Sequence, residues 1–293
     1  MMDIVQDRIR GIMVGEAVGD ALGFPVRRKR YPAMVDINGD YGWLPEYGLS
    51  GYCWGSRISA HTQFAIRTAN DLAEAGWHGM NLSDADALAL EVARRIHHRP
   101  QDYIPVVVLI HIIYILMRNA RPTKDLLIKH AFKGVNVMQK LLPECREEVW
   151  KVKNLIKRGL RFCESYTSSY SFRENDGVDQ SLSNYFISMI GEERTEGMAL
   201  AIALFSSISF FDRFPLVMIT AINHGGDSCA AASMAGCMMG AAMGLEGMEK
   251  VKPDWIRDLT SYPQMLHVAD EFWHGQTFFG DKVIGFHEDC PYR

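Results

Sequence analysis

Two runs of small residues at four-residue spacing constrain the fold of this chain more than any other feature. The runs are Gly11, Gly15, Gly19 and Gly23, and Ala232, Gly236, Gly240 and Gly244. Residues four apart lie on one face of a helix. Because a glycine inside a helix costs about 1 kcal/mol relative to alanine, several on one face indicate close packing there. We predict two helices at the centre of a bundle, packed against each other or against bulky aromatic side chains.

Helical periodicity extends over most of the chain, and the alternation typical of strands is nearly absent. Helices are expected at residues 3–19, 62–75, from Ser83 onward, 104–119, 123–141, 144–165, 179–190, 195–211, 213–222, from after Gly226 to about Gly244, 255–259 and 263–273. Residues 24–58, which are rich in proline and glycine, are expected to form a long loop, and residues 274–293 an irregular tail. The sequence therefore predicts one all-α domain over residues 1–293.

Composition excludes several classes of function. The net charge of -4 and the pI near 6.2 provide no global positive field for nucleic acid or membrane. The six cysteines form no CxxC pair, and the first residues lack the apolar segment of a signal peptide. The longest apolar run, residues 104–117, is shorter than the roughly 20 residues that span a bilayer. We expect a cytoplasmic protein with reduced thiols.

Three polar segments are the candidates for chemistry. Asp20 lies between two glycines, a position typical of a turn. Ser59 precedes a predicted helix that it can cap, with His61 beside it. Residues 223–229 open the second small-residue helix, where free backbone N–H groups suit an anion. Asp227 in this last segment is equally compatible with a simple N-cap.

The segments at residues 7–11, 17–25, 221–228, 235–236, 240–241 and 253–255 resemble ADP-ribosylglycohydrolases of the DraG type. The resemblance covers both ends of the chain and fades over residues 80–180. It implies an orthogonal helical bundle with a cleft that holds two Mg²⁺ or Mn²⁺ ions. It also implies cleavage of the bond between ADP-ribose and a protein side chain or small acceptor. Such ions prefer carboxylate and water ligands, which the family supplies from a Thr-Asp-Asp triplet and an Asp-x-Asp-Ser/Thr motif.

This chain departs from that ligand pattern. Ser59, Ala60 and His61 occupy the positions of the triplet, and Cys229 and Ala230 follow the one retained aspartate, Asp227. The basic run at residues 27–30 stands where the family usually has a glutamate. Because one carboxylate cannot offset two divalent ions, the sequence predicts no Mg²⁺ pair and no other cofactor.

Three interpretations fit these replacements. The first is an active hydrolase in which Glu16, Asp20 or Asp36 substitutes for the lost ligands. The second, which we favour, is a pseudoenzyme or binding module for ADP-ribose or an ADP-ribosylated protein, with arginines of the basic run on the phosphates. The third is a single metal site of His61, Asp227 and Cys229. The residues predicted to line the cleft are Asp20, Arg27, Ser59, His61, Asn223, His224, Gly225, Gly226, Asp227 and Ser228.

Overall fold

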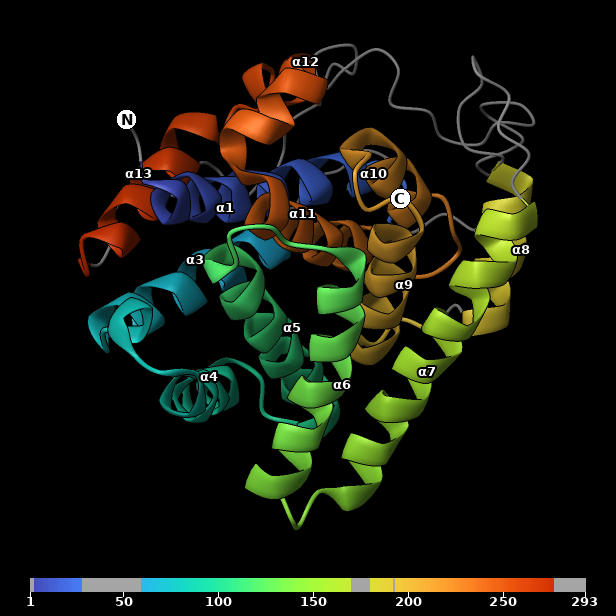
Figure 1. Cartoon of the computed structure of the whole chain (residues 1–293), viewed down its shortest axis with the longest axis horizontal. Helices are drawn as coiled ribbons and strands as arrows, with labels where there is room; N and C mark the ends of the chain where they lie inside the picture. Colours follow the sequence, from blue (N-terminus) through green and yellow to red (C-terminus); the bar gives the residue numbers. More distant parts are fainter. Residues whose placement is uncertain (1–2, 28–58, 170–179, 192, 277–293) are drawn as a thin grey trace.

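The computed structural model describes residues 3–27, 59–169, 180–191 and 193–276 (Figure 1). These residues form helices and connecting turns with no strand, which confirms the predicted all-α class. Most of the expected loop at 24–58, the basic residues 28–30, Asp36 and most of the tail at 274–293 lie outside the described residues. Buried apolar side chains from nearly all the described helices join in one continuous core.

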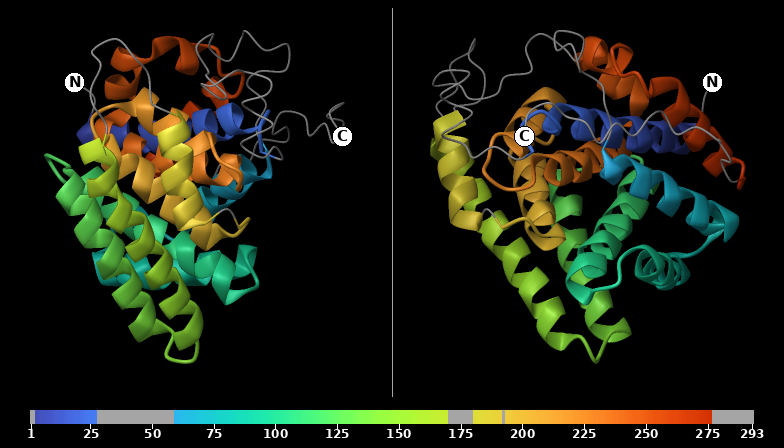
Figure 2. Two further views of the ribbon diagram at one scale, coloured as in Figure 1. Left: turned by 90° about the vertical axis from the view of Figure 1, so that its right-hand side faces the viewer. Right: turned by 180° about the vertical axis from the view of Figure 1, so that it is seen from behind.

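The two glycine-bearing helices pack against each other at the centre of the bundle. They are α1 (Ile4–Gly23) and α11 (Ser228–Val251), which lie side by side in Figures 1 and 2. A Cβ atom added to Gly11 would lie 2.7 Å from the Gly240 carbonyl oxygen, and one added to Gly23 would lie 2.7 Å from that of Ser228. The pairing runs in opposite directions along the two helices, so they are antiparallel, and only small residues allow their backbones to touch.

The ends of both helices differ from the sequence-based expectation. Helix α1 continues to Gly23 rather than ending at Gly19, so the expected turn at Asp20 is wrong and this residue lies in the helix. Helix α11 is assigned as far as Val251, but Gly244 has a φ of 73° that breaks its regularity at the expected end. Glycine adopts this left-handed conformation without steric cost.

The remaining helices pack on this pair or on helices that do (Figure 2). They are α3 (Ala60–Glu74), the short 3₁₀-helix η2 (Trp77–Gly79), α4 (Leu82–Ile96), α5 (Pro100–Arg118), α6 (Lys124–Leu141), α7 (Arg146–Ser169), α8 (Gln180–Ile190), α9 (Glu196–Ser209), α10 (Phe214–Ile222), α12 (Pro253–Arg257) and α13 (Tyr262–Trp273). Helix α13 is fixed to α1 by Arg10, whose Nε and Nη2 donate to the Asp270 carboxylate at 2.7 and 2.9 Å. Helices α6 and α7 form an antiparallel hairpin at one end of the molecule (Figure 1).

Helices α5 and α11 are long and apolar enough to cross a membrane. In this structure 72% of the most apolar segment of α5 and 94% of that of α11 are buried against other helices. A helix that is buried on most sides in a globular bundle is apolar on most of its surface, and this accounts for the composition of α5 and α11.

A buried polar network links α4, α5 and α6. Nδ1 of His111 lies 2.9 Å from one oxygen of the Asp86 carboxylate, and Nε2 of His111 lies 3.1 Å from Nδ1 of His130. All three side chains are buried. Asp86 therefore belongs to a buried network, although an aspartate near a helix start is common for the helix dipole alone. The N-cap of α4 is Asn81, whose Oδ1 accepts from the N–H groups of residues 83 and 84. Ser83, where the predicted helix begins, lies inside α4.

Candidate functional site

Asp20 ties the end of α1 to the start of α3. One carboxylate oxygen accepts from the Ser59 N–H at 2.5 Å and from the Thr62 hydroxyl at 2.8 Å. The side chain is fully buried, and its other oxygen has no hydrogen-bond partner among the described residues. Asp20 therefore holds the start of α3 in place, and this role explains why a carboxylate is tolerated inside the central helix.

Ser59 is the N-cap of α3, as the sequence predicts. Its hydroxyl oxygen accepts from the His61 N–H at 3.1 Å, and its side chain is buried. A capping hydroxyl satisfies one of the unpaired N–H groups at the helix start. The Ser59 hydroxyl thus helps to fix the backbone of His61 at the start of α3.

His61 and Asp227 face each other across the site. His61 lies in the first turn of α3, and its Nε2 is 3.7 Å from Oδ1 of Asp227. The two side chains are 29% and 30% exposed, so both reach solvent. Asp227 is also the N-cap of α11, since the same oxygen accepts from the Ala230 N–H at 3.1 Å. The N-cap interpretation of Asp227 is correct, and the residue has a second, solvent-facing role beside His61.

Glu196, in the first turn of α9, joins this pair electrostatically. Burial raises the pKa of Glu196, His61 lowers it, and the charge of Asp227 raises it further. Burial lowers the pKa of His97, the charge of Asp102 raises it, and His61 lowers it, so His97 interacts with His61 electrostatically. His97 is half-buried at the end of α4, with its ring 5.7 Å from that of Phe64, and His98 next to it is exposed.

The glycine-rich turn before α11 is held by its own side chains. Nε2 of His224 lies 2.9 Å from the Ala221 carbonyl oxygen, and Nδ1 accepts from the Gly226 N–H at 2.9 Å. Asn223 donates to the Ile219 carbonyl oxygen, and Ser228 donates to that of Ile222. Asn223, His224 and Ser228 are fully buried. We expected these side chains to line the cleft, but they build the turn that positions Asp227.

The chain's stability is expected to fall in mild acid because two buried histidines resist protonation. Burial lowers the pKa of His224 and of His130 to about 4. Unfolded imidazoles take up protons near pH 6.5, so stability is fully present above that pH and is lost as the pH falls toward 4. A shift of this size corresponds to about 3 kcal/mol per residue at most. The free energy of unfolding, measured with urea, should be lower at pH 5 than at pH 7.5. In His130→Asn the decrease between these two pH values should be smaller. A decrease as large as in the wild type would contradict the assignment for His130.

Cys229 does not join His61 and Asp227. Its thiol is fully buried and lies 3.8 Å from the Asp20 carbonyl oxygen. Burial, and then the charges of Asp20 and Asp227, raise the pKa of the Cys229 thiol well above its usual value. A metal ligand must be the thiolate, which this environment disfavours. Among the described residues, no three His, Cys, Asp or Glu side chains are close enough to hold a metal ion, so the predicted three-residue metal site is not assembled here.

Arg27 lies in the turn that follows α1. Its guanidinium carbon is 4.1 Å from the centre of the Phe24 ring. Its positive charge opposes the effects that raise the Cys229 pKa, which places it near the start of α11. Arg27 is the one member of the basic run that lies within the described residues.

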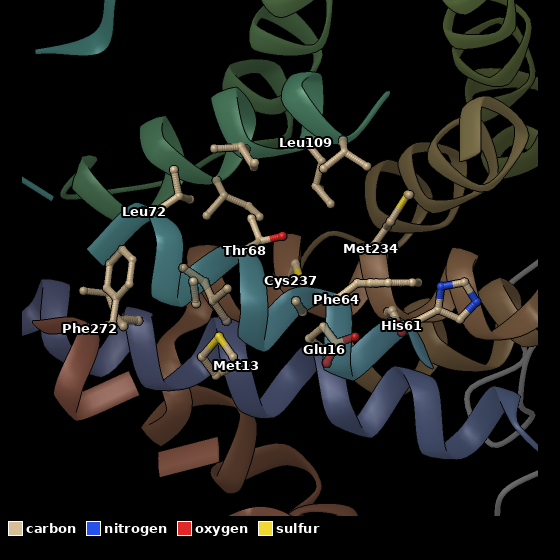
Figure 3. Close-up of a pocket in the computed structure, with 18 of the residues that line it drawn as sticks. Met13, Glu16, His61, Phe64, Thr68, Leu72, Leu109, Met234, Cys237 and Phe272 are labelled. Atoms are coloured by element: carbon tan, nitrogen blue, oxygen red, sulfur yellow. The ribbon is translucent and has the colours of Figure 1, made fainter. Parts of the chain in front are cut away.

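An apolar cavity of about 170 Å³ begins at this site and extends between α1, α3, α5, α11 and α13 (Figure 3). His61, Glu16 and Glu196 contribute polar atoms, and the rest of the wall is mainly aliphatic and aromatic. Sequence reasoning considered Glu16 only as a replacement ligand and did not identify Glu196 or His97. Glu16 precedes Asp20 by one helical turn on the glycine-bearing helix, and this pair of acids on one face was a usable signal.

Comparisons with known proteins find one matching family model. The family model described as ADP-ribosylglycohydrolase matches residues 1–98 and 75–278. A solved chain described as an ADP-ribosylglycohydrolase-related protein complex is 20% identical, with a TM-score of 0.45. That alignment covers 94% of this chain and 99% of the other. No curated protein sequence matches this chain.

Proposed function

Because the chain belongs to the ADP-ribosylglycohydrolase family, we propose that it binds ADP-ribose, free or attached to a protein, without the two-metal hydrolysis that the family resemblance implies. The proposal has two parts. The cleft is retained as a recognition site, and the metal centre is lost.

The donor set at the former metal positions carries this proposal. Of the aspartates that the resemblance implies as ligands, Asp227 alone is retained, and the imidazole of His61 and the buried thiol of Cys229 stand at two of the other positions. One oxygen of Asp20 holds the start of α3 through Ser59 and Thr62, and the side chain is fully buried. Two divalent ions bring four positive charges, and Asp227 with a partly buried Glu196 leaves most of that charge uncompensated. The residues present do not fit a Mg²⁺ pair.

The same side chains suit the hydroxyl and phosphate groups of ADP-ribose. Carboxylates accept hydrogen bonds from sugar hydroxyls. Glu196 lines the cavity, and Asp227 lies 3.7 Å from His61, which also lines it. Arginine binds phosphate through a two-pronged contact, and the charge of Arg27 acts on Cys229 at the start of α11. We propose that Asp227 and Glu196 hold the ribose and that Arg27 meets the pyrophosphate.

Replacing Asp227 by alanine is expected to weaken ADP-ribose binding at least tenfold, since a hydrogen bond to a charged group contributes about 1.5–3 kcal/mol. Isothermal titration calorimetry in EDTA measures this directly. The matched control is Asp125→Ala, which removes an exposed aspartate from the first turn of α6, away from the site. Loss of the N-cap lowers stability by about 1 kcal/mol, so both variants are first checked for folding by circular dichroism. Equal affinities for the two variants would place the ligand elsewhere.

A second candidate function is hydrolysis through a re-tooled site, and the proximity of His61 to Asp227 favours it. An imidazole held by a carboxylate is a common general base. Release of ADP-ribose from an ADP-ribosylated peptide, with Mn²⁺, Zn²⁺ or EDTA, distinguishes the two functions. We expect no release above that of the Asp227→Ala variant; clear release by the wild type alone would establish the hydrolase.

A further inference from the structure

The hairpin of α6 and α7 has a high density of positive charge. From Lys124 to Ser169 the chain has ten lysines and arginines against five aspartates and glutamates, a net charge of +5, whereas the whole chain has a net charge of -4. Cations recur at intervals of four or seven residues, which places them on one face of each helix. They are Lys129, Lys133 and Lys140 on α6, and Arg146, Lys153, Lys157 and Arg161 on α7. Lys153 is half-buried and the other six are exposed.

The two rows of cations lie on the same side of the hairpin. Nζ of Lys153 donates to Oδ1 of Asn136 at 3.1 Å. Asn136 belongs to the α6 row, because it follows Lys133 by three residues and precedes Lys140 by four. The helices are antiparallel (Figure 1), so Lys133 lies opposite Lys157, one turn further along. The seven cations therefore form one surface that is two helices wide, here called the basic surface.

The basic surface is not neutralised by the described part of the chain. None of its seven cations is in an ion pair with a described residue, and Glu147 on α7 pairs with Lys151 instead. Lys129 and Lys133 are four residues apart, and like charges at this spacing destabilise a helix. An anionic partner that covered the surface would relieve this repulsion, so the charge pattern favours binding of a polyanion.

An exposed tryptophan beside the cations indicates the kind of polyanion. Trp150 lies in the α7 row, four residues after Arg146, and is 63% exposed. Leu141, at the end of α6, is 39% exposed. Tryptophan is enriched at membrane–water interfaces, where its amphipathic ring lies at the level of the lipid headgroups. Clustered lysines and arginines are attracted to the anionic lipids of the same surface.

Two other classes of partner fit these observations less well. Five of the seven cations are lysines, and lysine is depleted from protein–protein interfaces. Proteins that bind single-stranded nucleic acid combine a charged groove with several aromatic side chains on which bases stack. Trp150 is the one aromatic residue in the two rows. Two helices side by side are also broader than the single helix that the major groove of DNA admits.

We propose that the basic surface attaches the chain to membranes that contain anionic lipid. The lysines and arginines lie at the headgroups, and Trp150 enters the interface. Each lysine or arginine near such a surface strengthens attachment about fivefold. The basic surface and the candidate site are built on different helices, so this attachment does not depend on ADP-ribose binding.

Co-sedimentation with lipid vesicles tests the proposal on the full chain. The wild type should sediment with vesicles of phosphatidylcholine and phosphatidylserine, and not with vesicles of phosphatidylcholine alone. Binding should be lost at about 1 M NaCl, where the Debye length is about 3 Å. Tryptophan fluorescence should shift to the blue on addition of the anionic vesicles, and this shift should be absent from Trp150→Phe.

The double variant Lys133→Gln/Lys157→Gln removes two cations that lie opposite each other. Its partition onto the anionic vesicles should be about 25-fold weaker than that of the wild type. The matched control is Lys250→Gln/Arg257→Gln, which removes two exposed cations from α11 and α12, far from the hairpin (Figure 1). Both variants have the same net charge, and circular dichroism checks that both are folded. The control should bind within about threefold of the wild type, since charges beyond a Debye length are largely screened.

Three results would overturn the proposal. The first is no sedimentation of the wild type with the anionic vesicles; retention of a single-stranded RNA oligonucleotide in that case would assign the surface to nucleic acid. The second is equal partition of the double variant and its control. The third is a blue shift that persists in Trp150→Phe.

Discussion

Replacing Gly236 by alanine should destabilise the chain by about 3 kcal/mol, at the upper end of the range for overpacked cores. The added Cβ would overlap the backbone carbonyl of Gly15, which is not the movable end of a flexible side chain. Helices α1 and α11 would have to separate, and the contacts along their whole interface would loosen. The gain of about 1 kcal/mol in helix propensity for alanine offsets only part of this loss.

Gly79→Ala is the matched control, because a Cβ at that position meets no atom within 4 Å. The free energy of unfolding, measured with urea, should change by less than about 0.5 kcal/mol for this surface substitution. A similar small change for Gly236→Ala would contradict the close packing of α1 on α11.

Replacing His111 by methionine should cost about 3–5 kcal/mol, because it leaves the buried Asp86 carboxylate without its partner. The side chain of Asp86 is 4% exposed, and that of His111 is 2% exposed. The double variant Asp86→Leu/His111→Met removes both polar groups and should be more stable than the single variant. Urea unfolding of the wild type, both single variants and the double variant completes the cycle. Additive losses in the double variant would show that the two residues do not act as a pair.

The architecture was largely predictable from periodicity. The spacing of Gly11 to Gly23 and of Ala232 to Gly244 predicted a central pair of helices in close contact, and the structure places these residues opposite one another. Helix bounds elsewhere were mostly within a few residues, because caps such as Thr123 and Thr195 carry local signals.

The candidate site was less predictable, because its contacts join residues far apart in sequence. Asp20 looked like a turn residue, and only its contact with Ser59, 39 positions later, explains an aspartate inside a helix. His224 looked like a ligand-facing side chain, but both its ring nitrogens are used within the turn. Cys229 lies on the side of α11 that faces α1, where its thiol is buried away from His61. The sequence alone did not indicate which side of α11 this would be.

The pairing of Asp86 with His111 illustrates the same limit on another face of the bundle. The two residues lie 25 positions apart on different helices. An aspartate in the first turn of a helix is common for reasons of helix dipole alone, so the local signal indicated a helix start. Only the packing of α4 on α5 shows that the carboxylate faces an imidazole.

Calorimetric titration of ADP-ribose into the wild-type chain, in EDTA and again in millimolar Mg²⁺, tests the central claim most directly. A recognition site without a metal centre predicts binding in both buffers with the same dissociation constant, within a factor of two. Binding that appears only with Mg²⁺ would contradict the claim, since it would require a metal site built from residues other than those described here. Absence of binding in both buffers would equally contradict it.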